Sequence, residues 1–429
     1  MTDPSAPFDR SLVPPALRDL DLGAIAAEFG TPCYVYDEDA LRARCREYVS
    51  AFGPGGVAYA GKAFLCTAMI RLVSEEGLHL DVATGGELHG ALRAGFPPER
   101  IVLHGNDKSD DELRAALAAG VGRIVADSHD ELDRLERLAA ELGVTPAVLV
   151  RVTPGVEAHT HEFIETGTER SKFGFTVSGG VALAAARRVA DSDVLDFVGL
   201  HCHIGSQIWV LDSYARAVDV VVALARELET LGVTTHELDL GGGLGVRYVA
   251  GDPEPAVAEY ADGLRRAVAA ARAATGLIAD PRITVEPGRS IAAPAGITLY
   301  RVGTRKEILG VGTYVSVDGG MSDNPRPILY GARYEAFLPA APDAPRDLAC
   351  TIVGKHCEQG DVLVADARLP GSVGPGDLLA TPVTGAYGAS MASNYNKVPR
   401  PAVVFVRDGR ARSVVRRESL DDLWRLDEE

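Results

Sequence analysis

The sequence lacks the features that mark membrane-spanning, disulfide-stabilised and nucleic-acid-binding proteins. No run of apolar residues approaches the roughly 18 that are needed to span a bilayer. Residues 1–15 carry acidic residues and prolines and no apolar stretch, so we expect no signal peptide. The six cysteines form no CxxC pair, which predicts reduced thiols in a cytoplasmic protein rather than a disulfide framework or a zinc site. The formal net charge of -17 would repel nucleic acids and anionic membranes, so neither is an expected partner.

The composition that remains is that of an ordinary globular protein with room for two domains. The 429 residues exceed a single typical domain. Hydrophobic residues make up 46% of the chain and charged residues 24%, a balance that supplies an ample core. Such an acidic chain can still bind an anion through a local cluster of arginines and backbone amides.

The first two thirds of the chain alternate short apolar strands with amphipathic helical stretches. Ser109 is followed three residues later by Glu112, and Ser128 by Glu131, which is the capping-box signal at the start of a helix. The eight expected strands are 57–60, 78–83, 101–104, 123–126, 147–152, 197–203, 237–240 and 282–286. Eight such units predict a TIM-like (β/α)8 barrel. A doubly wound sheet is the rival, but it usually has fewer strands, and no G-x-G-x-x-G follows the first one.

Beyond residue 292 the helical periodicity fades. Short β-segments separated by Gly, Pro and Asp take over, which predicts an antiparallel β-sandwich or β-barrel domain. We therefore expect an α/β protein in three parts. They are an N-terminal segment, 1–36, that joins and packs on the β-domain, a (β/α)8 barrel, 37–292, and a C-terminal β-domain, 293–429.

Polar residues gather at the carboxyl ends of the predicted barrel strands, where barrel enzymes build their active sites. Lys62 follows the first strand, and Asp81 lies in the second. Later strands end in His201, His203 and Ser206, in the triplet Gly241-Gly242-Gly243, and in Glu286, Pro287, Gly288 and Arg289. We expect these residues to converge on one mouth of the barrel.

Lys62 is the most informative of them, because it stands between apolar neighbours in Tyr59-Ala60-Gly61-Lys62-Ala63-Phe64. Burial there would remove its hydration and favour the neutral amine, which attacks carbonyl carbons and suits a Schiff base with an aldehyde cofactor. The alternative is a lysine whose ammonium reaches the surface beside a turn glycine.

The neighbouring motifs match the other groups of such a cofactor. The glycine triplet can bring three backbone amides against a phosphate, with the Ser206 hydroxyl as a further donor, although a tight βα turn would also explain it. Glu286 can pair with Arg289, or it can hold a pyridine nitrogen protonated. A lysine, a phosphate cup and a carboxylate together indicate pyridoxal phosphate (PLP).

A metal pair formed by His201 and His203 is the weaker interpretation. No third ligand stands at a useful spacing unless His159 or His161 is recruited. One imidazole stacked on a planar cofactor explains the motif better, so we expect no metal.

The predicted β-domain carries a second set of reactive residues. Cys357 lies beside Lys355 and His356, which would favour its thiolate and make it a proton donor or acceptor, whereas a small buried apolar residue is the simpler alternative. Arg326 and Tyr330 lie in a proline-rich loop that suits a carboxylate ligand, although a solvated loop remains possible on the sequence alone.

Together these motifs closely resemble the diaminopimelate decarboxylases, which are fold-type III PLP-dependent decarboxylases related to alanine racemase. The resemblance extends from residue 30 to about residue 396. It is carried, in order, by Tyr59-Ala60-Gly61-Lys62, Leu80-Asp81-Val82-Ala83-Thr84-Gly85-Gly86-Glu87-Leu88, Gly199-Leu200-His201-Cys202-His203-Ile204-Gly205-Ser206-Gln207, Gly241-Gly242-Gly243, Glu286-Pro287-Gly288-Arg289, Arg326-Pro327-Ile328-Leu329-Tyr330, Cys357-Glu358 and Gly385-Ala386-Tyr387.

The resemblance implies a role for each of these residues. Lys62 would form the internal aldimine with PLP, His203 would stack on its ring, and Glu286 would pair with its ring nitrogen. The implied cofactor-binding set is completed by Asp81, Ser206, Gly243, Pro287, Gly288, Arg289 and Tyr387, and the implied substrate-binding set is Arg289, Arg326, Tyr330, Glu358 and Tyr387. Cys357 would deliver the proton that replaces CO₂. Cys357 and Glu358 would enter the active site of a neighbouring subunit, which implies a homodimer.

The implied reaction is decarboxylation of meso-2,6-diaminopimelate to L-lysine, the last step of lysine biosynthesis. Arg326 and Arg289 can pair with the distal carboxylate of that substrate, and Glu358 can pair with its distal ammonium. Ornithine would need an acidic pocket and no arginine fork. Two alternatives remain open. One is a related decarboxylase for carboxynorspermidine, arginine or a carrier-bound amino acid, and the other is a non-catalytic PLP-binding homologue. An alanine racemase is disfavoured, because racemisation needs no grip on a distal carboxylate. Gln359 is the one small departure, because family members commonly have a small residue there.

Overall fold

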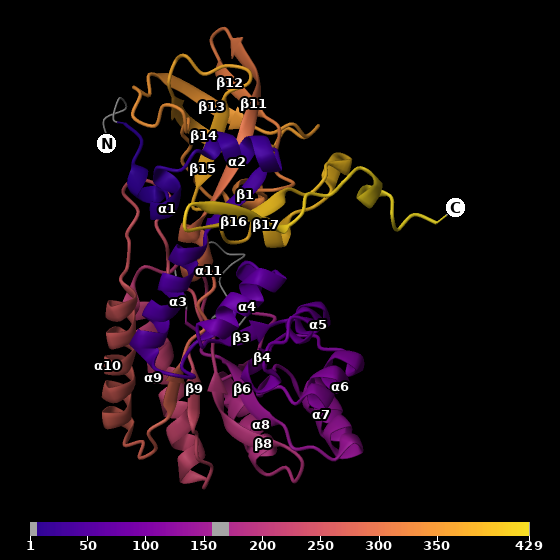
Figure 1. The fold of residues 1–429 in the computed structure, drawn as a ribbon. Coiled ribbons are helices and arrows are strands. Elements are labelled where there is room, and N and C mark those ends of the chain that lie inside the picture. The colour runs from indigo at the N-terminus through magenta and orange to yellow at the C-terminus, as the bar shows by residue number, and fades with distance from the viewer. Residues whose placement is uncertain (1–6, 157–170, 429) are drawn as a thin grey trace. The chain divides into compact units, whose positions relative to one another are not determined.

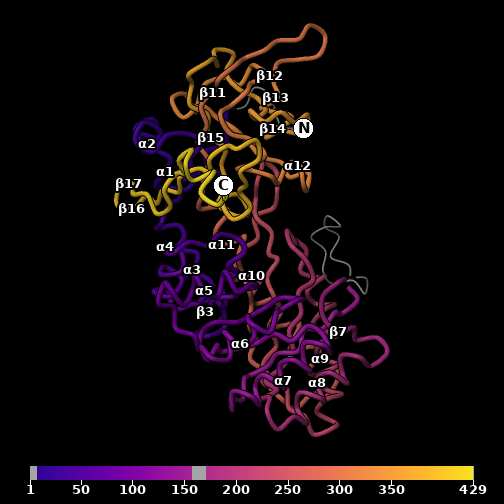
Figure 2. The backbone as a smooth tube through the Cα atoms, turned by 90° about the vertical axis from the view of Figure 1, so that its right-hand side faces the viewer, coloured from indigo at the N-terminus to yellow at the C-terminus, as the bar shows by residue number. Residues whose placement is uncertain are grey.

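The computed structural model describes residues 7–156 and 171–428, and the chain divides into two compact units. The barrel unit comprises Arg44–Gly245 and Glu254–Ser290, and the β unit comprises Met1–Ala43, Val246–Pro253 and Ile291–Glu429. Figure 2 lets the chain be followed by colour from the β unit into the barrel unit; it enters the β unit again briefly at Val246–Pro253, returns to the barrel unit and ends in the β unit.

The barrel unit is built around eight parallel strands. They are β2 (Ala58–Ala60), β3 (His79–Val82), β4 (Ile101–Leu103), β5 (Arg123–Ala126), β6 (Ala147–Thr153), β8 (Asp196–His201), β9 (Glu237–Asp239) and β10 (Arg282–Thr284). Each strand pairs with the next, and the short strand β7 (Phe175–Thr176) pairs with β6. The ring closes because the Ala58 amide donates to the Val285 carbonyl at 2.9 Å and the Val285 amide donates to the Gly56 carbonyl at 3.0 Å. The predicted (β/α)8 barrel is confirmed.

Helices connect these strands and cover the outside of the barrel unit (Figure 1). They are α4 (Thr67–Glu75), α5 (Gly85–Arg93), α6 (Asp110–Ala119), α7 (His129–Leu142), α8 (Val181–Ala190), α9 (Leu211–Thr230) and α10 (Val257–Thr275); α3 (Glu38–Phe52) and α11 (Arg289–Ala292) each cross from one unit to the other in sequence.

The two predicted capping boxes have different outcomes. At α6 the box is complete, because Ser109 accepts from the Glu112 amide and the Glu112 carboxylate accepts from the Ser109 amide. At α7 only half of it forms. Ser128 accepts from the Glu131 amide, but the Glu131 carboxylate bonds the Lys108 ammonium at 2.7 Å instead. A buried ion pair has displaced the second cap bond.

The β unit contains one sheet that includes a strand from the start of the chain. Its strands are β1 (Cys33–Asp37), β11 (Gly296–Ile308), β12 (Gly312–Val317), β13 (Leu348–Val353), β14 (Val362–Leu369), β15 (Leu378–Pro382), β16 (Ala402–Arg407) and β17 (Arg410–Val415). The order is β14-β13-β12-β11-β1-β16-β17, with β15 also paired to β11. The N-terminal segment thus joins the β-domain, as predicted, by supplying a fully buried central strand.

The sheet is mostly antiparallel, but β1 pairs with β16 in parallel and so does β12 with β13. Parallel neighbours require a long crossover. The β12–β13 connection supplies one that contains helix α12 (Arg326–Tyr330), and nearly the whole chain separates β1 from β16. The remaining helices of this unit are α1 (Pro15–Arg18) and α2 (Leu22–Phe29). None of the helices in the described ranges combines the length and apolar character that a bilayer crossing requires.

Candidate active site

The strand register places a ring of polar side chains inside one end of the barrel. Directly paired residues of parallel strands point to the same face, and residues two apart along a strand do so as well. Arg151 pairs with His201, and His201 pairs with Asp239. Below them lies an apolar cluster formed by Ala58, Val102, Val125 and Leu149. From the cluster residues Val102, Val125 and Leu149, the next inward positions are His104, Asp127 and Arg151, so these chains become polar towards the carboxyl ends of the strands, which is where barrel active sites form.

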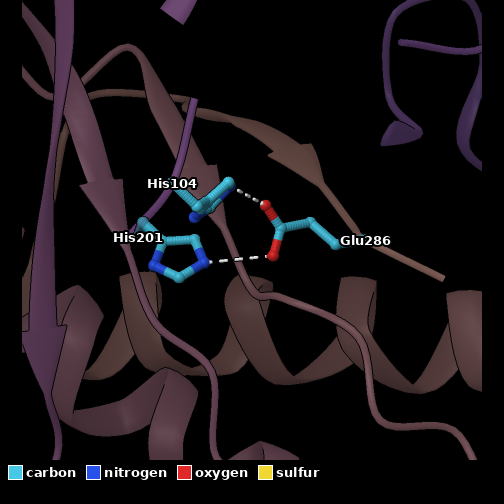
Figure 3. Close-up of side chains that lie close together, drawn as sticks. All are labelled: His104, His201 and Glu286. Carbon is cyan, nitrogen blue, oxygen red and sulfur yellow. Dashed lines mark hydrogen bonds and ion pairs between the residues drawn. The ribbon is translucent and has the colours of Figure 1, made fainter. Parts of the chain in front are cut away.

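Glu286 belongs to this ring, and its carboxylate faces two neighbouring histidines (Figure 3). His104 Nε2 is 2.5 Å from Oε1 of Glu286, and His201 Nε2 is 3.2 Å from Oε2. The two imidazoles meet edge to face, with their ring centroids 4.9 Å apart. His104 was not among the predicted site residues. Its only signal in the sequence is its position two residues beyond Val102 on a barrel strand.

The charges of this trio follow from burial and proximity. Burial would raise the pKa of Glu286, but the two histidines beside it hold that pKa well below its usual range. Burial lowers the pKa of His104 to about 4 against the pull of the carboxylate, and it lowers the pKa of His201 as well. At neutral pH the trio is therefore one carboxylate and two neutral imidazoles.

Two further carboxyl groups of the ring are pushed towards their neutral forms. Burial, and then the charge of Glu286, raises the pKa of Asp81 and that of Asp239 well above their usual range. Arg151 offsets part of this negative charge; it lies 3.8 Å from the Asp127 carboxylate. The neutral forms of Asp81 and Asp239 add no negative charge beside Glu286.

Lys62 lies on a single helical turn, Gly61–Ala63, that directly follows β2. Its neighbours Gly61 and Ala63 are buried, but the Lys62 side chain is exposed in this chain. The expectation that burial removes its hydration is therefore wrong, because Lys62 is exposed on this turn. The charge of Lys62 still acts on the ring of polar side chains. Burial and the charge of Glu286 raise the pKa of Asp81, and Lys62 opposes them. Burial lowers the pKa of His203, and Lys62 lowers it further.

The glycine triplet is required first of all by close packing. Gly241 has φ 65°, and a Cβ there would lie 2.7 Å from both the Cys202 carbonyl oxygen and His203 Nδ1. The amide of Gly241 donates to Asp239 Oδ1 at 2.9 Å, and the amide of Gly242 donates to His203 Nδ1 at 3.2 Å. The expectation that all three amides bind one anion is therefore wrong. Gly243 is the glycine of the triplet whose amide is left to bind an anion. The hydrogen bond from the Gly242 amide to Nδ1 also fixes the plane of the half-buried His203 ring.

Ser206 and Arg289 meet beside the triplet. Arg289 donates to Ser206 Oγ from Nε at 3.1 Å and from a terminal nitrogen at 2.8 Å. Arg289 is buried and follows Pro287 and Gly288. A Cβ added at Gly288 would collide with Ala63. A hydroxyl and a buried guanidinium side by side form a natural anion site.

In the β unit, Arg326 is buried between two tyrosines that the sequence did not single out. Its guanidinium carbon lies 4.6 Å from the ring centre of Tyr248 and 5.5 Å from that of Tyr334, and it donates to the Tyr334 hydroxyl. Burial lowers the pKa of Arg326, but the tyrosines raise it more. Within the described ranges no carboxylate pairs with Arg326, and its Nε and both amide atoms of buried Asn324 have no hydrogen-bond partner.

The remaining predicted residues of the β unit lie on turns. Cys357 and Glu358 are exposed, as is Gln359, and the Cys357 amide donates to Asn396 Oδ1 at 3.0 Å. The ring of His356 is turned into the unit, where its Nε2 bonds Ser322 Oγ at 2.8 Å. The expected support of the Cys357 thiolate by His356 is therefore absent.

Tyr330 and Tyr387, the last two predicted residues, are both half-buried. Tyr330 ends α12, and Tyr387 has φ 59°, an uncommon backbone conformation for a residue other than glycine. The alternative metal interpretation paired His201 with His203, but the structure brings His201 together with His104 and Glu286 instead, and the potential ligand atoms of these three lie within 4.8 Å of one another. His159 and His161 lie outside the described ranges, and His203 does not belong to the His104–His201–Glu286 group.

The barrel residues fit PLP by their chemistry. Lys62 offers an amine to an aldehyde, Ser206, Gly243 and Arg289 offer donors to a phosphate, and the ionised Glu286 offers an acceptor to a pyridinium. A family model described as the pyridoxal-binding domain of pyridoxal-dependent decarboxylases matches residues 38–293, more than half of the chain. Fold and site thus define a PLP-dependent decarboxylase.

The relatives narrow this class. The chain is 52% identical to a diaminopimelate decarboxylase of Mycobacterium tuberculosis over 96% of this chain and 94% of that protein, and 48% identical to one of Bacillus subtilis over 94% and 92%. Its fold matches the crystal structure of a diaminopimelate decarboxylase from Helicobacter pylori complexed with L-lysine, with a TM-score of 0.87, 34% identity, and coverage of 95% of this chain and 99% of that one. The chain belongs to the diaminopimelate decarboxylase family, which confirms the resemblance inferred from its motifs.

Proposed function

We propose that the protein decarboxylates meso-2,6-diaminopimelate to L-lysine and CO₂ and so completes lysine biosynthesis. The observation that carries the choice of substrate is Arg326, a buried cation that has no carboxylate partner in the described part of its own chain. A buried unpaired charge is costly, so a site of this kind is built for an anionic ligand. The distal carboxylate of a dicarboxylic amino acid meets that need, whereas the side chains of ornithine and arginine would bring a second cation.

The barrel residues would hold the cofactor at both ends. Ser206, Gly243 and Arg289 would donate hydrogen bonds to its phosphate, and Lys62 would bind its aldehyde carbon. Glu286 would accept a hydrogen bond from the ring nitrogen. The neutral imidazole of His203, fixed by the Gly242 amide, presents a flat face for stacking. The cofactor-binding roles of Asp81, Pro287, Gly288 and Tyr387 belong to the same proposal.

When bound, the cofactor supplies an electron sink for the pair that the leaving carboxyl group gives up. Glu286 supports this electron sink by remaining an ionised carboxylate. The charge of Arg151 and the N–H groups of the two neutral histidines stabilise its carboxylate, and the raised pKa values of Asp81 and Asp239 keep further negative charge away from the ring nitrogen.

The β unit would bind the substrate and return a proton. Arg326, held by Tyr248 and Tyr334, would pair with the distal carboxylate, and Glu358 would pair with the distal ammonium. Tyr330, Tyr387 and Arg289 are proposed to complete the grip.

Cys357 would donate the proton that replaces CO₂: its S–H bond breaks, a C–H bond forms at the substrate α-carbon, and a thiolate remains. Exposure of Cys357 and Glu358 fits the proposal that they serve the active site of a partner subunit in a homodimer. All six cysteines are free thiols, which fits the proposed cytoplasmic location.

The deciding experiment compares CO₂ release from meso-diaminopimelate, ornithine, arginine and carboxynorspermidine by the purified holoenzyme. We expect turnover of meso-diaminopimelate alone, with L-lysine as the product. Preferred turnover of another substrate would identify a related decarboxylase, and binding of PLP without CO₂ release from any of the four would identify a non-catalytic homologue.

A further inference from the structure

The carboxylate of Glu286 faces two neighbouring histidines that cofactor binding by itself does not require. Each carboxylate oxygen faces the Nε2 atom of one imidazole, at 2.5 Å for His104 and 3.2 Å for His201 (Figure 3). None of the three residues is more than 7% exposed. Since the rings also pack against each other at 65°, neither can turn away without opening a void in the barrel.

The location of the protons follows from this packing. Burial keeps both histidines neutral at physiological pH, so each ring carries a single N–H. A carboxylate attracts the N–H of a neutral imidazole and repels its bare nitrogen. Both Nε2 atoms therefore carry hydrogen. His201 donates a hydrogen bond to Oε2 of Glu286, whereas the N–H of His104 lies close to Oε1 as an electrostatic contact without the alignment of a hydrogen bond. A carboxylate offers about four lone-pair sites, so it can still accept from a further donor, the N–H of a pyridinium ring.

We propose that His104 and His201 are positioning residues that keep Glu286 ionised and aimed, so that the proton it shares with the cofactor ring nitrogen stays on the nitrogen. Each N–H held against the carboxylate stabilises its charged form and makes it a weaker base. Without the two N–H groups, burial would favour the neutral carboxylic acid, and the proton would move to Glu286. An uncharged ring nitrogen is a weaker electron sink.

The inference rests on the proposed placement of Glu286 at the ring nitrogen and is independent of the substrate. Other titratable or charged groups interact with the same carboxylate; they are Asp81 of β3, Arg151 of β6, Asp239 of β9, and Cys202 and His203 after β8. These groups stay unchanged in the variants below, so they do not affect the comparison.

The test pairs substitutions that remove a donor with substitutions that keep one. His104→Leu and His201→Leu remove the N–H, whereas His104→Gln and His201→Gln retain an amide N–H near the same point. His89→Gln, at an exposed histidine of α5, is the control. The holoenzymes are loaded with PLP carrying ¹⁵N at the ring nitrogen, and the ¹⁵N chemical shift is recorded from about pH 6 to about pH 9 together with the PLP dissociation constant.

We expect a protonated ring nitrogen in the wild type, in the control and in both glutamine variants. In the leucine variants the signal should move towards the unprotonated shift, and PLP should dissociate about tenfold more readily. A protonated ring nitrogen in both leucine variants would overturn the inference, and so would glutamine variants that behave like the leucine ones, because the role would then be one of shape alone.

Two further measurements keep the test decisive. Glu286→Gln must itself shift the ring-nitrogen signal; if it does not, the proposed placement of Glu286 has failed rather than the role of the histidines. In case a leucine variant does not fold, ¹⁵N spectra of histidine-labelled wild-type apoprotein report the imidazole tautomers directly. Both His104 and His201 should carry hydrogen on Nε2, and a bare Nε2 on either ring would overturn the inference.

Discussion

Replacing Tyr334 by phenylalanine should raise the KM for meso-diaminopimelate and leave kcat nearly unchanged. The variant keeps the charge of Arg326 and the aromatic ring beside it but removes the hydroxyl to which the guanidinium donates. Loss of one such hydrogen bond is worth about 0.5–1.5 kcal/mol, which corresponds to a KM roughly 2- to 10-fold higher. Arg326→Gln loses the charge-assisted pair itself, worth about 1.5–3 kcal/mol, and should raise KM about 10- to 150-fold.

Inhibition by two small molecules separates this role from a general loss of structure. L-lysine retains an amino-acid head with a carboxylate, whereas cadaverine has none. The wild type should therefore bind L-lysine more tightly than cadaverine, and Arg326→Gln should abolish the difference. Arg333→Gln, at an exposed arginine nearby in the sequence, is the matched control and should change neither constant. Unchanged KM in Tyr334→Phe, or an unchanged preference for L-lysine in Arg326→Gln, would refute the assignment of Arg326 to the distal carboxylate.

Three further predictions concern the proton donor, the core and the pH dependence of stability. Cys357→Ala should keep the absorbance of bound PLP but lose about 10²-fold or more in turnover, and full activity would remove Cys357 from the mechanism. Lys108→Met leaves Glu131 buried without its partner, so urea unfolding should show a loss of about 3–5 kcal/mol, much of it regained in Lys108→Met/Glu131→Leu; an unchanged midpoint in the single variant would contradict this. Burial raises the pKa of Asp323 to about 7, so the folded state binds the extra proton and stability should fall as pH rises from about 4 to about 7. Asp323→Asn should flatten that fall, and an equally steep profile in the variant would exclude Asp323 as its source.

The sequence predicted the barrel well because its signals are local. Buried parallel strands appear as short apolar runs, and the observed strands begin and end within two residues of the expected positions, as β4 (Ile101–Leu103) and β5 (Arg123–Ala126) show. Because side chains alternate between the two faces of a strand, the residues that face the barrel interior then follow at every second position. The direction in which β1 pairs with β16 was not predictable, because no local signal connects strands separated by most of the chain.

The sequence predicted those site residues whose type and immediate neighbours indicate their chemistry. It missed those whose role depends on contact with residues that are distant in the sequence. Lys62, Glu286 and Arg326 stand out as charges in apolar or proline-rich surroundings. His104 resembles any residue at the end of a strand until it is seen beside Glu286, from which 182 positions separate it in the numbering of the chain. Tyr248 and Tyr334 likewise gain meaning only where they enclose Arg326. The exposure of Lys62 depends on a turn geometry that its neighbours do not specify.

The attachment point of the cofactor tests the central claim most directly. The holoenzyme is reduced with borohydride and digested, and the peptide that carries the pyridoxyl group is sequenced by mass spectrometry. The account predicts one modified residue, Lys62, and no modification in Lys62→Ala. A pyridoxyl group on another lysine, or a reduced holoenzyme without any, would contradict it.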